Sequence, residues 1–123
     1  MPHLTLHAAE TDLTGREEKL IASLTDAITT VYGDWARPIA VVHLVGVPAG
    51  RWGIGGVTAE TPAPTITFGI KEEAFTRPGA VERLAKEVTG AVATVLGSHL
   101  HDKITINFIG TLPGRTATGG SLS

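Results

Sequence analysis

The stretch GVPAGRWGIGG, residues 46–56, decides the fold, because the chain repeats it as GTLPGRTATGG at residues 110–120. At the same offset of 64 residues, TDAITTVYG (25–33) recurs as TGAVATVLG (89–97). Nearer the start, PHLTL (2–6) matches PTITF (64–68) at an offset of 62. Segments that match in the same order at nearly one offset indicate a duplicated unit.

Each copy of the unit has the pattern of a strand, a helix and a second strand. HLTLH (3–7) and TITFGI (65–70) are rich in β-formers and predict the opening strands. IAVVHLVGV (39–47) and KITINFIG (103–110) predict the closing strands. Between them, apolar residues at helical spacing predict one helix in each copy. These residues are Leu20, Leu24, Ala27, Ile28 and Val31 in the first copy, and Val81, Leu84, Ala85, Val88, Val92 and Val95 in the second.

Residues at the helix ends suggest where each helix begins and stops. Thr14 and Thr76 are candidate N-caps, because a threonine hydroxyl can accept a hydrogen bond from a free amide at a helix start. Gly33 and Gly97 are candidate C-terminal stops.

The order of elements predicts an α/β protein of the two-layer α+β type. Strand, helix and strand form a right-handed βαβ unit with parallel strands. Two such units, about 2–57 and 64–120, would make one domain with a four-stranded sheet and two helices on one face. Few residues remain to cover the other face. We therefore expect that face to be uncovered, fairly apolar and used for association with further copies.

Composition excludes several classes of function. The chain has 123 residues, a net charge of −2 and no cysteine, so disulfides and thiolate chemistry are ruled out and nucleic-acid binding is disfavoured. No apolar run approaches the roughly 20 residues of a membrane-spanning helix. The start, MPHLTLHAAE, lacks the basic and apolar regions of a signal peptide. We expect a cytoplasmic protein with no membrane partner.

The start of the chain and the glycine-rich turn together resemble the tautomerase superfamily. Members of that superfamily place a catalytic proline directly after the initiator methionine, as in MPHLTL here. RWGIGG resembles the aromatic-GIGG turn of 4-oxalocrotonate tautomerase (4-OT), and VPAGRWGIGG is similar to turns of cis-3-chloroacrylic acid dehalogenase, which also has the doubled βαβ length. The resemblance implies a homotrimeric isomerase that shuttles a proton in a small enol or 2-hydroxy-dienoate carboxylic acid. It implies no metal and no organic cofactor.

Pro2 is the candidate catalytic residue. A proline at a free N-terminus is a secondary amine, and as a base it must be unprotonated, whereas an ordinary α-amino group titrates near pH ~8. Apolar surroundings or nearby cations lower such a pKa towards working pH, where a general base is most efficient. Met1 must be removed for this chemistry, and a small second residue such as proline normally permits that removal.

The glycine-rich turn supplies two candidate substrate-binding residues. The glycines would let the backbone bend back to the mouth of the site, so that Trp52 walls the Pro2 pocket and Arg51 binds the substrate carboxylate. The simpler interpretation is a hairpin turn with an incidental arginine. The absence of GxGxxG and of a P-loop disfavours phosphate binding.

Other cations would have to replace the arginines that 4-OT carries where this chain has Asp12 and Val41. The candidates are Lys71 and Arg77, in GIKEEAFTRPG. A lysine cannot bind a carboxylate in bidentate fashion, as an arginine can. The simpler interpretation is that both residues lie in a solvated loop. Asn107, in the apolar stretch TINFI, is expected to meet a polar partner, either a substrate oxygen or the backbone.

Two alternatives remain open. Pro2 could stay protonated and act as general acid in a hydratase, decarboxylase or dehalogenase of a small unsaturated or β-keto acid. Hydrolytic dehalogenation is disfavoured, because the dehalogenase histidine corresponds to Ile28 and its late carboxylate has no counterpart in TATGGSLS. The chain could also be a non-catalytic binding or assembly module.

The five histidines are expected in the core or in loops, because HLH (99–101) lacks a third metal ligand.

Overall fold

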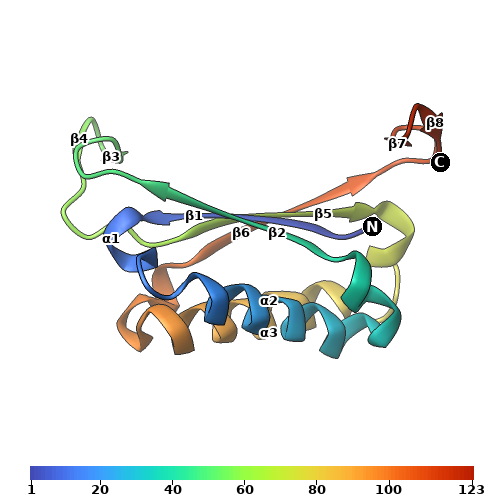
Figure 1. Cartoon of the computed structure of the whole chain (residues 1–123), viewed down its shortest axis with the longest axis horizontal. Helices are drawn as coiled ribbons and strands as arrows, with labels where there is room; N and C mark the ends of the chain where they lie inside the picture. The colour runs from blue at the N-terminus through green and yellow to red at the C-terminus, as the bar shows by residue number, and fades with distance from the viewer.

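The computed structural model describes residues 1–123 and has two layers, a sheet and a pair of helices (Figure 1). The sheet has the strand order β2-β1-β5-β6. Its strands are β1 (His3–Ala9), β2 (Val41–Val47), β5 (Thr65–Lys71) and β6 (Thr105–Thr111). The helices α2 (Glu17–Tyr32) and α3 (Ala80–Leu96) cover one face. This arrangement confirms the predicted fold class.

Shorter elements connect the main ones. They are α1 (Glu10–Leu13), the 3₁₀ turns η1 (Asp34–Ile39), η2 (Glu72–Phe75) and η3 (Ser98–Lys103), and the short strands β3 (Gly53–Ile54), β4 (Val57–Thr58), β7 (Ala117–Thr118) and β8 (Ser121–Leu122). None of the helices combines the length and apolar character that crossing a membrane requires.

The two halves of the chain meet through the central strands. β1 pairs in parallel with β2, and β5 pairs in parallel with β6, whereas β1 and β5 are antiparallel. The register places Thr5 opposite Thr67 at the middle of this antiparallel pair. The second half therefore runs opposite to the first, and each end of the sheet holds the start of one half and the end of the other.

Both glycine-rich stretches form hairpins of the same type. Gly55 and Gly56 connect β3 to β4 with φ of 64° and 86°, and Gly119 and Gly120 connect β7 to β8 with φ of 58° and 83°. Two consecutive positive φ angles are typical of a type I′ turn, which matches the twist of a hairpin. The two hairpins rise at opposite ends of the sheet, on the side away from the helices (Figure 1).

The core lies between the sheet and the helices. Phe68 at the centre of β5 is fully buried, and its ring centroid lies 6.3 Å from that of Phe75 and 6.1 Å from that of Phe108. The apolar residues predicted at helical spacing supply most of the helix side of the core. Its buried members on the sheet are Leu4, Leu6, Ala8, Ile66, Phe68 and Ile70, and on the helices Leu20, Leu24, Ala27, Ile28, Tyr32, Leu84, Val88, Val92 and Leu96.

The helix ends confirm the predicted stops but not the predicted starts. Gly33 and Gly97 terminate α2 and α3 with positive φ. Thr14 and Thr76 are not N-caps, because α2 begins at Glu17 and α3 at Ala80. The hydroxyl of Thr14 instead donates to the Glu10 carbonyl, and that of Thr76 to the Glu73 carbonyl. A threonine hydroxyl bonds a preceding carbonyl as readily as a following amide, so each closes the turn before it.

The face of the sheet away from the helices is uncovered, as expected, but its centre is not apolar. The central strands present polar side chains on this face: His3, Thr5, His7, Thr65, Thr67 and Lys71. Its apolar residues are concentrated on the edge strands, at Val41, Val45, Val47 and Ile109. The expectation failed because threonine forms strands as well as valine does, so a strand-forming pattern does not show that both faces are apolar.

Replacing Phe68 with alanine is expected to lower the free energy of unfolding by about 3–5 kcal/mol, because it removes a fully buried ring and leaves a cavity. Urea denaturation at fixed protein concentration measures the change. Leu122→Ala is the control, since Leu122 is 71% exposed and its truncation should cost less than about 0.5 kcal/mol. Equal losses in the two variants would contradict this assignment of the core.

Candidate active site

Pro2 lies at the entrance to β1, buried beneath the exposed Met1. Its carbonyl accepts a hydrogen bond from the Val41 amide at 2.9 Å, which ties the start of the chain to β2. Pro64 occupies the equivalent place before β5, where its carbonyl accepts from the Thr105 amide at 3.3 Å. Both prolines are almost completely buried. The residue before Pro2, Met1, is 49% exposed.

Two hollows adjoin Met1. One has a volume of about 310 Å³ and is lined by Met1, Trp35, Ile70, Lys71, Glu73, Ala74 and Arg77. The other, of about 390 Å³, lies towards the open face and the C-terminal hairpin, and is lined by Met1, His3, Gly69, Ile70, Lys71, Thr111, Thr116, Thr118 and Ser123. Because Met1, Ile70 and Lys71 line both, the Met1 side chain stands where the hollows meet.

The first hollow carries more positive than negative charge. Lys71 at the end of β5 and Arg77 before α3 both line it, together with the carboxylate of Glu73. None of the three belongs to an ion pair; the one arginine–carboxylate pair is Arg37–Asp26, and the remaining close contact of this kind is His101–Asp102. The positive charges of Lys71 and Arg77 are therefore available to a bound anion. The structure brings Lys71 and Arg77 to the Pro2 end, as the sequence led us to expect.

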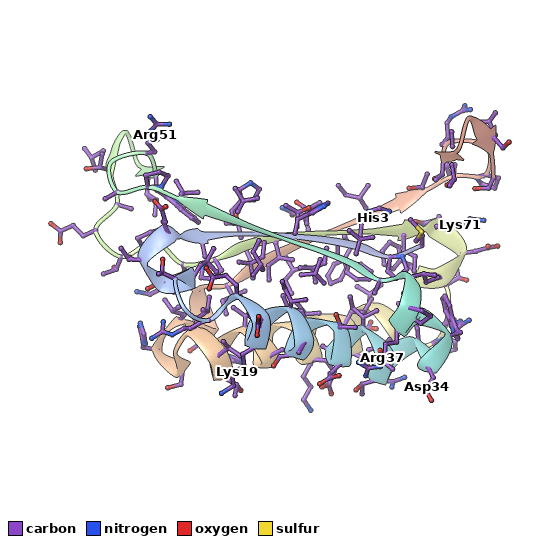
Figure 2. All side chains as sticks on the ribbon, in the orientation of Figure 1. His3, Lys19, Asp34, Arg37, Arg51 and Lys71 are labelled. Carbon is purple, nitrogen blue, oxygen red and sulfur yellow. The ribbon has the colours of Figure 1, made fainter.

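Arg51 and Trp52 lie at the opposite end of the sheet. Figure 2 shows Arg51 on the hairpin far from His3 and Lys71. The register explains the separation, because β1 and β2 are parallel and seven residues long, which is about 20 Å of strand, and Arg51 follows the far end of β2. Within one chain, Arg51 and Trp52 therefore lie far from Pro2, and their predicted role beside Pro2 stays a prediction that a single chain does not support.

Asn107 is not part of either hollow. It lies midway along β6 on the open face, in a lateral row that runs His43, Thr5, Thr67, Asn107 across the sheet. Asn107 and His43 hold equivalent positions in the two halves and are both exposed. A substrate role for Asn107 stays a prediction that a single chain does not support.

Two aromatic residues that the sequence patterns did not indicate, Tyr32 and Trp35, do lie at this end. Trp35 is 48% exposed and lines the first hollow, and its indole N–H donates to the Tyr32 carbonyl at 2.7 Å. At the equivalent places in the second half the chain has Leu96 and His99. That difference between otherwise matched repeats was a usable signal, because Trp35 is one of only two tryptophans.

The hydroxyl of Tyr32 has a perturbed pKa. Burial raises the pKa of its hydroxyl above the ordinary value of 10.0, and the positive charge of Arg77 partly offsets the increase. The hydroxyl is consequently neutral at physiological pH and donates to the Ala74 carbonyl at 3.1 Å. This bond joins the end of α2 to the segment that follows β5.

Comparison with known proteins defines the fold. No family model matches the sequence, and no curated protein matches it. Among solved structures, the chain is similar to an asymmetric trimer of wild-type fused 4-OT, with 19% identity and a TM-score of 0.85 over 98% of this chain and 94% of that one. It is similar to native fused 4-OT, with 21% identity and a TM-score of 0.84 over the same shares. It is also similar to the macrophage migration inhibitory factor of Toxoplasma gondii, with 13% identity and a TM-score of 0.76 over 98% of this chain and 99% of that one.

These likenesses confirm the resemblance to tautomerases at the level of the fold. The chain has the doubled βαβ architecture of fused 4-OT, and its fold is also similar to that of macrophage migration inhibitory factor.

The raised pKa of Tyr32 predicts a pH dependence of stability. When folding raises the pKa of a group, the group contributes its full stabilisation at pH values below its pKa in the unfolded chain. This contribution is lost as the pH rises through its pKa in the folded protein. The stability advantage of the wild type over Tyr32→Phe should therefore be constant from about pH 8 to 10 and shrink above it. Urea denaturation across this range measures it. A difference in unfolding free energy between the wild type and Tyr32→Phe that stays constant to about pH 11 would show that Tyr32 has the same pKa in the folded and unfolded chain.

Proposed function

We propose that this protein, once Met1 is removed, is a tautomerase that moves a proton within a small enol or 2-hydroxy-dienoate carboxylic acid, with Pro2 as the base. The tautomerase-type fold agrees with such a reaction. The observation that carries the proposal is the position of Met1 between the two hollows. Removing that residue would join them into one cleft above the freed Pro2 nitrogen.

The surroundings of Pro2 suit a neutral amine. Lys71 and Arg77 are unpaired cations of the adjoining hollow, and Ile70 lines both hollows. Nearby positive charge and burial both disfavour a protonated amine and lower its pKa. The same two cations would bind the substrate carboxylate and stabilise the oxygen as negative charge develops on it.

The proposed reaction is an isomerisation. The Pro2 nitrogen takes the proton of the substrate hydroxyl, and the C–O bond gains double-bond character as electrons move along the conjugated chain. The protonated nitrogen then returns the proton to a carbon of that chain. One O–H bond is lost and one C–H bond forms, so the product is an isomer and no oxidant, reductant or organic cofactor takes part.

Replacing Pro2 with alanine should lower kcat/KM for phenylenolpyruvate by about 100-fold or more, which is the range of a lost general base. Pro64→Ala is the matched control, because Pro64 is equally buried at the equivalent place but has no free nitrogen. Intact mass spectrometry should show that the active protein begins at Pro2. Retained Met1 in active protein, or an equal loss in the two variants, would overturn the proposal, and inactivity towards a panel of enol acids would favour a non-catalytic binding module.

One observation favours a second candidate, in which protonated Pro2 acts as general acid. Glu73 lines the same hollow, and a nearby carboxylate raises the pKa of an amine. Such a site would suit hydration or decarboxylation of a small unsaturated or β-keto acid. If Pro2 is the base, kcat/KM should increase with pH through the pKa of Pro2. A decrease over the same pH range would identify it as the acid.

We also propose a homotrimer in which each copy supplies Arg51 and Trp52 to the Pro2 of its neighbour. In a closed three-membered ring, two different patches of the chain meet at every interface. The hairpin β3–β4 projects from the end opposite Pro2 and exposes Ile54 and Val57, as an interface would require (Figure 2). Fused 4-OT, which shares the fold, has been solved as a trimer.

Mixing two inactive variants tests this arrangement. If Pro2 and Arg51 act across the interface, then Pro2→Ala and Arg51→Ala chains assembled together should regain activity in about a quarter of their sites, because some sites combine an intact Pro2 with a neighbour's intact Arg51. Each variant alone should be nearly inactive. No recovery in verified mixed trimers, or full activity of Arg51→Ala alone, would exclude a site shared between chains.

A further inference from the structure

Arg77 lies over an aromatic ring and is otherwise unpartnered. The central carbon of its guanidinium is 5.5 Å from the centroid of the Tyr32 ring, which is within the distance of an attractive cation–π contact. Arg77 makes neither an ion pair nor a side-chain hydrogen bond with the rest of the chain; the arginines that donate such bonds are Arg16, Arg37 and Arg83. The contact with Tyr32 thus holds the guanidinium while its N–H groups stay free for a ligand.

Tyr32 contacts three parts of the first hollow at once. Its ring lies under Arg77, and its hydroxyl donates to the carbonyl of Ala74, a lining residue in the segment between β5 and α3. Its carbonyl accepts the indole N–H of Trp35, whose ring centroid lies 6.1 Å from that of Tyr32. Tyr32 is itself 5% exposed at the end of α2 and does not line the hollow. It acts on the site through its neighbours.

The second half of the chain lacks this arrangement. Leu96 ends α3 as Tyr32 ends α2, and His99 takes the place of Trp35. Leucine offers neither a hydroxyl for the loop nor a ring for a cation. The core does not need a tyrosine at this position, since Leu96 is buried to the same extent in the equivalent place.

We propose that Tyr32 is a positioning residue for carboxylate binding: it holds Arg77 as the carboxylate-binding group of the hollow and Trp35 as a flat wall for the conjugated part of the acid. The proposal rests on the proposed function and extends it, since it explains how an exposed arginine is held in place. The Tyr32 hydroxyl is protonated throughout the physiological pH range, since its pKa lies above the ordinary value of 10.0, and its bond to Ala74 persists there.

Two variants distinguish the contribution of the Tyr32 hydroxyl to substrate binding from that of its ring. Tyr32→Phe keeps the ring but frees Ala74, and should raise KM about two- to fivefold, the effect of one neutral hydrogen bond. Tyr32→Leu also removes the cation–π contact and should raise KM about tenfold. In both variants kcat should change less than KM, because Pro2 is untouched and Lys71 still stabilises the developing negative charge. Leu96→Val, a buried change at the equivalent place in the other half, should leave KM as in the wild type.

The NMR signal of the Arg77 side chain gives a readout that does not require turnover. In ¹⁵N-labelled protein, the Nε–H resonance of Arg77, assigned by its loss in Arg77→Lys, should show the ring-current shift expected above Tyr32 and should move on addition of pyruvate. Tyr32→Leu should abolish the ring-current shift and weaken pyruvate binding. Tyr32→Phe should keep the shift, and Leu96→Val should keep both.

The inference is overturned if both Tyr32 variants retain wild-type KM and pyruvate affinity, or if Leu96→Val changes them as much. Thermal melts identify a misfolded variant. If Tyr32→Leu is misfolded, the result for Tyr32→Phe, which keeps the shape of the side chain, decides whether the inference holds. Pyruvate binding that depends on Tyr32 in a Pro2→Ala background would support the positioning role even if Pro2 were not the base. Loss of activity in Pro2→Ala with no dependence on Tyr32 would support the proposed function alone.

Discussion

The antiparallel pairing of β1 with β5 is the constraint on which the rest of the structure depends. It joins two parallel βαβ units into one sheet, with Thr5 opposite Thr67 at its centre. Because the halves run in opposite directions, Pro2 at the start of β1 meets the end of β5, where Lys71 lies. The same pairing sends the first hairpin, with Arg51, to the other end of the sheet (Figure 2).

The two halves of the backbone are therefore related by a near symmetry, but the side chains at the two ends of the sheet differ. Each end has a buried proline, a helix terminus and a glycine-turned hairpin. The Pro2 end alone combines a hollow, unpaired cations and the pair Tyr32 and Trp35. Duplication supplied the stable core, and the chemistry we propose depends on substitutions that distinguish one copy from the other.

Much of the fold was predictable because the repeat and the β and helical patterns are local properties of the chain. The end of each helix at Gly33 and Gly97 was predictable for the same reason, whereas Thr14 and Thr76 had two hydrogen-bonding options of similar energy. Lys71 and Arg77 were assigned to the Pro2 end through a resemblance that preserves the order of elements.

The sequence did not show where Trp52 lies relative to Pro2, because a motif identifies a kind of turn and not the end of the sheet, or the copy of the chain, at which that turn acts. Trp35 was missed because its position depends on the fold around Tyr32. The substrate, the cytoplasmic location and the roles of individual site residues stay predictions.

A titration of the N-terminal nitrogen by NMR, in protein labelled with ¹⁵N-proline, tests the central claim most directly. Our account predicts a secondary amine at Pro2 that changes protonation near neutral pH, whereas a nitrogen that stays an amide to Met1 in active protein would contradict it.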